Sequence, residues 1–157
     1  MGLLSCFFAL LLGIWYLSVV LNNILDWRRN YQLVGDVIAM RATPLDGALI
    51  GRAILSPFAH KIAFATLVLW ELLCAGAFLR GAQLGISDLY WGRAASGHWK
   101  EFIFVGVGMG LAVWLFGFIT VGGQWFCSWR TPLANGIDPA FRMIVCHCFL
   151  AVMTNAA

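Results

Sequence analysis

The stretch that decides the fold is IAFATLVLWELLCAGAFL at residues 62–79, an apolar run whose only charged side chain is Glu71. Lys61 precedes the run and Arg80 follows it. Its length suffices for an α-helix to cross a bilayer, which takes about 17–25 apolar residues. Glu71 would then lie near the midplane, where an ionisable side chain is costly and needs a partner. The stretch predicts a transmembrane helix with one buried carboxylate.

The composition of the whole chain supports this interpretation. Hydrophobic residues make up 62% and charged residues 11% of the 157 positions, whereas soluble domains have about 45–50% and about 25%. We therefore expect one integral membrane domain over residues 1–157, with membrane lipid as its surroundings. The net charge of +3 is spread along the chain, so no basic cluster indicates a nucleic-acid partner.

Three further apolar runs bring the predicted spans to four, at residues 3–21, 57–79, 102–121 and 139–157. Ser56-Pro57 and Asp138-Pro139 are typical helix starts, with a capping side chain before a proline at the first helical position. Asn22-Asn23 and Gly122-Gly123 are the expected ends of the first and third spans. The first run has no basic residue before it, so we interpret it as a retained span and not as a cleaved signal peptide. The predicted fold is an all-α bundle of four transmembrane helices, with both termini on the same side.

Residues 24–55, here called loop 1, are too many for a plain connector. Tyr31, Val34 and Ile38 recur at helical spacing among polar residues, which predicts an interfacial amphipathic helix. Residues 43–46, TPLD, resemble a capping box that opens a further turn. This segment is either a lid over the helix ends or a surface for a partner.

Small residues recur at every fourth position in two of the spans. Ser5, Ala9 and Gly13 form one such stripe, and Gly106 and Gly110 form the other. Small side chains let helix backbones approach closely in lipid. The stripes predict close helix packing, either within the bundle or against a helix of another subunit.

Two ionisable residues fall near mid-depth, Glu71 and His147. A Glu71–His147 pair across two helices would satisfy both groups, although the spacing does not show that they face each other. The hypotheses for this intramembrane site are a structural link between helices, a proton relay or substrate contact, and a ligand or pigment contact.

No metal site or catalytic set is expected. Cys146, His147 and Cys148 are adjacent and would point about 100° apart on a helix, so they cannot close on one ion. His60, His98 and His147 lie at three different depths, which argues against haem ligation by two histidines. No motif of a hydrolase, metalloprotease or nucleotide-binding loop occurs. We expect no cofactor and no enzyme activity; a bound lipid is compatible with the chain, and a quinone or pigment contact stays open.

Several motifs carry a family resemblance. They are Asn22-Asn23 with Asp26, Arg52 to Pro57 leading through His60 to Trp70-Glu71, Trp114 to Phe118, Val121 to Phe126, Trp129, Asn135-Gly136 and Ala140 to Arg142. In these motifs the chain resembles the DUF2165 family of predicted small integral membrane proteins of bacteria, over nearly its whole length. Gln124 stands where glutamate is usual in that pattern. The resemblance implies a bacterial inner-membrane protein and no particular activity.

The orientation has two conflicting indications. A count of Lys and Arg places loop 1 and the loop before the fourth span in the cytoplasm. The resemblance implies cytoplasmic termini instead, and we adopt this topology as the expectation.

The leading functional hypothesis is an accessory or structural subunit of a larger inner-membrane complex, respiratory or photosynthetic. Small-residue packing faces and the absence of a catalytic set favour it. The alternative is a small proton-coupled transporter, or a transporter subunit, that uses Glu71. The residues expected to form a loop motif at one membrane face are Asn22, Asn23, Asp26, Arg52, Gln124, Trp125, Trp129 and Arg142.

Overall fold

The structure, a computed structural model, describes residues 2–41, 47–92, 97–132 and 134–157, and this part of the chain is helical without strands. The elements in chain order are α1 (Gly2–Leu25), α2 (Trp27–Ile38), η1 (Gly47–Arg52), α3 (Pro57–Tyr90), α4 (His98–Leu111), η2 (Ala112–Trp125), η3 (Ser128–Arg130) and α5 (Ile137–Asn155). The predicted all-α class is confirmed.

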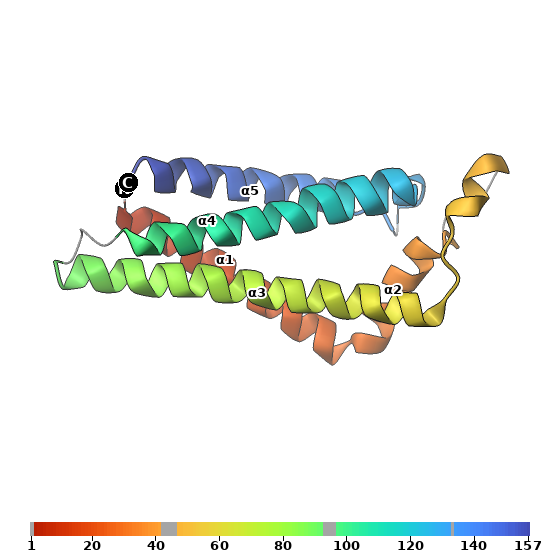
Figure 1. Cartoon of the computed structure of the whole chain (residues 1–157), viewed down its shortest axis with the longest axis horizontal. Coiled ribbons are helices and arrows are strands. Elements are labelled where there is room, and N and C mark those ends of the chain that lie inside the picture. The colour runs from red at the N-terminus through yellow and green to blue at the C-terminus, as the bar shows by residue number, and fades with distance from the viewer. Residues whose placement is uncertain (1, 42–46, 93–96, 133) are drawn as a thin grey trace.

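Within the described residues, four helices are long and apolar enough to cross a membrane: α1, α3, α4 continued by η2, and α5. Figure 1 shows α3, α4 with η2, and α5 side by side along the long axis, α1 crossing them obliquely, and α2 and η1 together at one end. The start of α1 and the C-terminus lie at the opposite end (Figure 1). We call these the lid end and the terminal end. The prediction of a four-helix membrane bundle with a helical loop 1 is therefore confirmed.

The helix ends differ from the predicted span ends. Asn22 and Asn23 lie inside α1, Gly122 and Gly123 lie inside η2, and α3 continues past Arg80 to Tyr90. A charge or a polar pair ends an apolar run, but it does not break backbone hydrogen bonding. Arg80 is exposed and donates to Gln83 Oε1 at 3.0 Å, so the helix passes through it.

The two predicted proline starts have different outcomes. Ser56 caps α3 as expected, because its hydroxyl accepts from the Ala59 amide at 3.4 Å and Pro57 is the first helical residue. α5 begins earlier than residue 139, at Ile137, and its N-cap is Gly136. Asp138 therefore lies in the first turn of α5 and is not its cap. Its carboxylate is still favourable there, because the N-terminal end of a helix carries partial positive charge.

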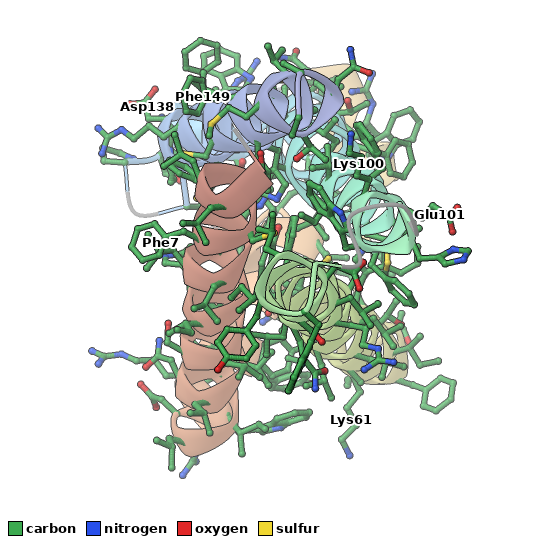
Figure 2. The ribbon with its side chains drawn as sticks, turned by 90° about the vertical axis from the view of Figure 1, so that its left-hand side faces the viewer. Phe7, Lys61, Lys100, Glu101, Asp138 and Phe149 are labelled. Carbon is green, nitrogen blue, oxygen red and sulfur yellow. The ribbon has the colours of Figure 1, made fainter. Side chains whose placement is uncertain are left out.

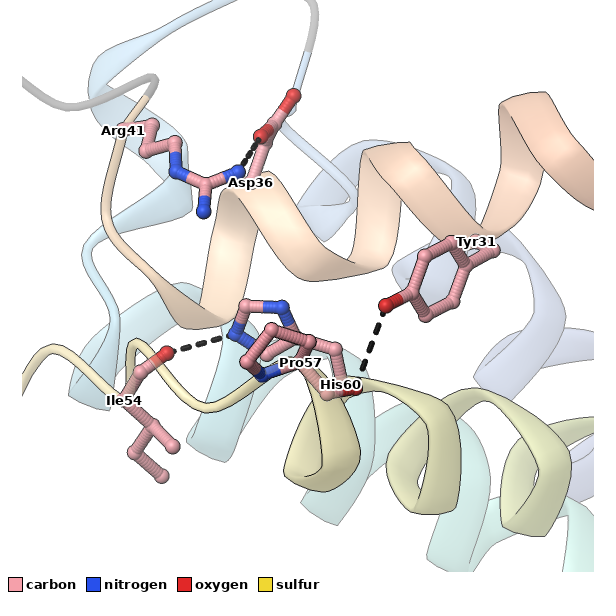
Figure 3. Close-up of polar contacts among 6 residues, drawn as sticks. All are labelled: Tyr31, Asp36, Arg41, Ile54, Pro57 and His60. Carbon is pink, nitrogen blue, oxygen red and sulfur yellow. Dashed lines mark hydrogen bonds and ion pairs between the residues drawn. The ribbon is translucent and has the colours of Figure 1, made fainter.

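α2 is the predicted amphipathic helix, and it lies over the start of α3. The Tyr31 hydroxyl donates to the Pro57 carbonyl at 3.2 Å, and His60 Nε2 bonds the Ile54 carbonyl at 2.6 Å (Figure 3). Gly35 packs on His60, since a Cβ there would lie 3.1 Å from Nδ1. These contacts are those of a lid. The predicted capping box at residues 43–46 lies outside the described residues.

The core follows the line where α1, α3, α4 and α5 meet. α1 and α4 both pack closely on α3, and α5 packs on α4 and η2. Buried in this core are Cys6, Ala9, Leu12, Tyr16, Cys74, Ala75, Phe78, Ala82, Trp99, Ile103, Val107 and Leu150. Large apolar side chains also cover the outside: Phe7 and Phe149 are about half exposed, and Figure 2 shows Phe7 pointing away from the bundle. A lipid solvent accounts for such a surface, because it does not penalise exposed apolar groups.

The third span changes its winding at Ala112. From there to Trp125, η2 is a π-helix, in which hydrogen bonds skip five residues. The Phe126 amide, for example, donates to the Val121 carbonyl at 3.0 Å. π-Helical turns are rare and frequent at functional sites, which directs attention to what η2 lines.

Candidate functional site

A chain of hydrogen bonds joins three helices at the centre of the bundle. Tyr16 of α1, Trp114 of η2 and His147 of α5 are all buried. Trp114 Nε1 donates to the Tyr16 hydroxyl oxygen at 2.9 Å, and that hydroxyl lies 3.1 Å from His147 Nε2. His147 Nδ1 lies 2.6 Å from the Met143 carbonyl.

The chemistry of the groups gives this chain a direction. A carbonyl oxygen only accepts, so His147 Nδ1 carries the proton that it donates to Met143. Nε2 of the neutral imidazole is then an acceptor, and the Tyr16 hydroxyl donates to it. Each hydrogen-bonding atom of the chain thus has its complement, and the buried cluster links α1, η2 and α5.

Gly110 makes room for this cluster. A Cβ at this position would collide with the His147 ring and would lie 2.9 Å from the Tyr16 hydroxyl oxygen. The glycine spacing of the third span therefore has an internal reason: Gly106 faces the Phe78 ring, which a Cβ would meet at 2.8 Å.

The first small-residue stripe also lies inside the bundle. Ser5 and Ala9 are fully buried, and a Cβ at Gly13 would lie 2.7 Å from Leu79 Cγ. Like Gly106 and Gly110, these positions are used for packing between helices of this chain. These two stripes are therefore already occupied by helices of this chain.

Glu71 forms a second buried polar contact, with α1. Asn23 Nδ2 donates to Glu71 Oε2 at 2.8 Å, and the glutamate is 2% exposed. Next to it, Trp70 Nε1 donates to the Met109 carbonyl at 3.0 Å and ties α3 to α4. Asn23, expected in a loop motif, is therefore an intramembrane partner of Glu71.

The hypothesis of a Glu71–His147 pair is wrong, because each residue has a different partner on α1. Tyr16, which bonds His147, stacks on Phe78 with ring centroids 6.0 Å apart. Glu71 precedes Phe78 by two turns of α3, about 10 Å along the helix axis. Their levels in the bundle do not coincide.

Two other residues of the predicted loop motif meet at the lid end. Arg52 of η1 places its guanidinium 4.7 Å from the centroid of Trp125 and donates to its carbonyl at 3.4 Å, which links loop 1 to the end of η2. The Asn22 carbonyl accepts from Asn30 Nδ2 at 3.3 Å. The four remaining members are exposed: Asp26, Gln124, Trp129 and Arg142.

An apolar groove of about 780 Å³ opens between α2, α3 and η2, reaching the loop before α5. Its walls are aliphatic and aromatic side chains from α2, α3 and η2, and its few polar members include Ser128 and Asn135. The volume falls in the range of ligand pockets, about 300–1,000 Å³. Sequence patterns did not indicate this groove, because it depends on how far α2, α3 and η2 lie from one another.

Two packing positions were not predicted, although their spacing in the sequence indicates them. Gly81 and Gly85 repeat the small-residue spacing in α3, and a Cβ at either would clash with α4 or α1. The predicted span ended at residue 79 and therefore did not include these two glycines.

Tyr16 and Trp114 had no such signal, because aromatic residues are common in apolar helices. Among the described residues, no group of three or more His, Cys, Asp or Glu side chains is placed to hold a metal ion.

Comparison with known proteins gives one match. A family model described as a predicted small integral membrane protein, DUF2165, matches residues 1–157. No curated protein and no solved structure matches the chain.

Proposed function

Because this chain belongs to the DUF2165 family of predicted small integral membrane proteins, we propose that it acts within the membrane, as an accessory, structural subunit of a larger assembly. The assembly that best suits a chain of this size is an inner-membrane complex of the respiratory or photosynthetic kind. The proposal gives the protein no reaction of its own.

One observation carries the proposal: the two intramembrane ionisable residues are engaged in holding helices together. Glu71 accepts from Asn23, and His147 bonds Tyr16 and Met143. Interhelical hydrogen bonds of this kind stabilise membrane bundles. Groups used in this way support a scaffold and not a reaction centre.

The lid end supplies a surface suited to a partner. Arg52 stacks on Trp125, and Gln124, Trp129 and Arg142 are exposed. Arginine and tryptophan are enriched where proteins bind one another. These exposed residues of the predicted loop motif support docking of a partner. The small-residue stripes do not, because they pack inside the bundle.

The test is isolation of the native protein in mild detergent, followed by mass spectrometry of the proteins that co-migrate with it. A stoichiometric set of membrane partners is expected, and Arg52→Ala with Trp125→Ala should weaken the association. Phe149→Ala, on an exposed helix face away from the lid end, is the matched control. A chain that always migrates alone contradicts the proposal.

A proton-coupled transporter is the second candidate, and Glu71 is its motivation. Its hydrogen-bond partner, Asn23, is a neutral amide, and no ion pair among the described residues includes Glu71. Proton flux into proteoliposomes, followed with a pH-sensitive dye, should disappear in Glu71→Gln while the variant stays folded. Equal flux from the original protein and Glu71→Gln would remove this candidate.

A further inference from the structure

The groove between α2, α3 and η2 has a defined position in the bundle. Its deep end is at Trp70, whose bond to the Met109 carbonyl holds α3 against α4. From there it extends toward Ala63 on α3 and toward Ser128 and Asn135. The Ala63–Trp70 segment is about 10 Å long at 1.5 Å per residue. This α3 wall of the groove is shorter than the hydrocarbon part of one leaflet, which is about 15 Å thick.

The groove is too small to enclose a membrane-spanning helix. A helix about 10 Å wide and 30 Å long fills about 2,400 Å³, three times the 780 Å³ of the groove. Water is excluded by the walls, because ordered water needs two to four polar partners. A flexible hydrocarbon chain meets both conditions.

Two hydrogen-bond donors lie at the lid end of the groove. Ser128 lines it and is 4% exposed, and its hydroxyl has no hydrogen bond to the described residues. Asn135 uses its side-chain oxygen to accept from the Ile137 amide at 3.1 Å, which leaves its NH₂ group without a bond to the described residues. Both groups line the groove and can donate to an acceptor on an occupant.

Two arginines belong to segments that adjoin groove residues in the chain. Arg130 belongs to the same short helix as Ser128 and stacks on Trp129, and Arg52 stacks on Trp125, next to the groove residue Phe126. Neither arginine forms an ion pair with the described residues. An anionic head would be attracted here.

We propose that this groove binds an anionic phospholipid: an acyl chain fills it as far as Trp70, and phosphate or ester oxygens accept from Ser128 and Asn135. Other occupants are a membrane quinone, which lacks the negative charge, and a segment of a partner protein. The site belongs to this chain alone and does not require the accessory-subunit role.

The chain offers a matched pair of variants for the test. Gly117 lines the groove, and a Cβ there meets only the Ala112 carbonyl at 3.9 Å. Gly117→Leu therefore places a side chain in open space at the groove. Gly108 is exposed outside the groove, with nothing within 4 Å of an added Cβ, so Gly108→Leu is the control.

The experiment reconstitutes delipidated protein into phosphatidylcholine vesicles with or without phosphatidylglycerol, then counts retained lipid by native mass spectrometry in mild detergent. The original protein and Gly108→Leu should retain phosphatidylglycerol in preference to phosphatidylcholine, and Gly117→Leu should lose it at least several-fold. Equal retention by Gly117→Leu and Gly108→Leu, or equal retention of both lipids by the original protein, would overturn the proposal.

Two additions keep the test decisive. Ser128→Ala removes one oxygen and nothing else, so several-fold weaker retention by this variant supports the site even if Gly117→Leu does not fold. Unchanged retention by Ser128→Ala counts against the head-group assignment. Protein taken directly from native membranes should carry a phospholipid. Detection of a quinone by its mass, or of a partner protein cross-linked through a photoreactive residue at position 70, would overturn the phospholipid assignment.

Discussion

At the residue scale, the hydroxyl of Tyr16 is where three helices connect. It accepts from Trp114 and donates to His147, all within the buried core. Removing one oxygen therefore affects two neighbours, and a buried group that loses its partner has a cost of its own. The membrane reduces this cost, because unfolded helices in lipid also find partners.

Tyr16→Phe should lower the free energy of unfolding by about 1–2 kcal/mol, since Trp114 Nε1 and His147 Nε2 both lose a partner. Reversible unfolding in mixed micelles, followed by circular dichroism, measures this change. Tyr90→Phe is the control, because Tyr90 is 79% exposed. Equal stability of the two variants would mean that the hydrogen-bond chain contributes nothing.

Glu71 allows a similar separation of charge from hydrogen bonding. Glu71→Gln keeps an oxygen that can accept from Asn23 Nδ2, so its stability should stay within about 0.5 kcal/mol of the original. Glu71→Leu leaves that amide unsatisfied and should cost about 1 kcal/mol more than Glu71→Gln. The same unfolding assay distinguishes them; a Gln variant as unstable as the Leu variant would show that the charge itself is needed.

At the scale of elements, the approach of α4 to α5 depends on glycine at one position of the third span. His147 occupies the space above Gly110, whereas Gly108 points into open surroundings. The two glycines are two residues apart on one helix, so they share its backbone and depth. Their difference isolates packing from helix propensity.

Gly110→Ala should destabilise the bundle by about 1–3 kcal/mol, as overpacking does. Gly108→Ala should be neutral or should stabilise by up to about 1 kcal/mol, because alanine favours a helix over glycine. Thermal unfolding of both variants in one detergent is the measurement. A neutral Gly110→Ala would mean that α4 and α5 are further apart than the structure has them.

At the scale of the whole molecule, an even number of spans places the two ends of the chain together. Figure 1 shows the start of α1 and the C-terminus at the terminal end, away from α2 and η1. The lid end carries the groove, the exposed arginines and the Arg52–Trp125 contact. The two membrane faces of the protein are therefore chemically different.

Reporters at the N- and C-termini should give the same sidedness, and a tag inserted at Gly51, which has open space around it, should give the opposite one. We expect the termini on the cytoplasmic side. Protease or label accessibility in intact cells measures this. Termini on opposite sides would contradict the four-span arrangement, and Gly51 on the cytoplasmic side would reverse the expected orientation.

Particular residues show how far sequence patterns reached. Ser56-Pro57 predicted the start of α3, because a cap is a local contact between neighbours in the chain. Asn22-Asn23 did not end α1, because one of the pair found a partner in Glu71, 48 residues away. Polar side chains mark the end of an apolar run, and the backbone can stay helical beyond it, as α3 does past Arg80.

By itself, the sequence determined the class of the protein, its four spans and its amphipathic lid, because a bilayer responds to the length and pattern of apolar runs and both are local properties. Tertiary structure decided the partners of Glu71 and His147, the internal use of the small-residue stripes, and the groove. These depend on the rotation and relative depth of helices that are far apart in the chain. Lipid sets the depth of a helix only approximately and does not set which helix it faces, so packing between specific side chains determines these features.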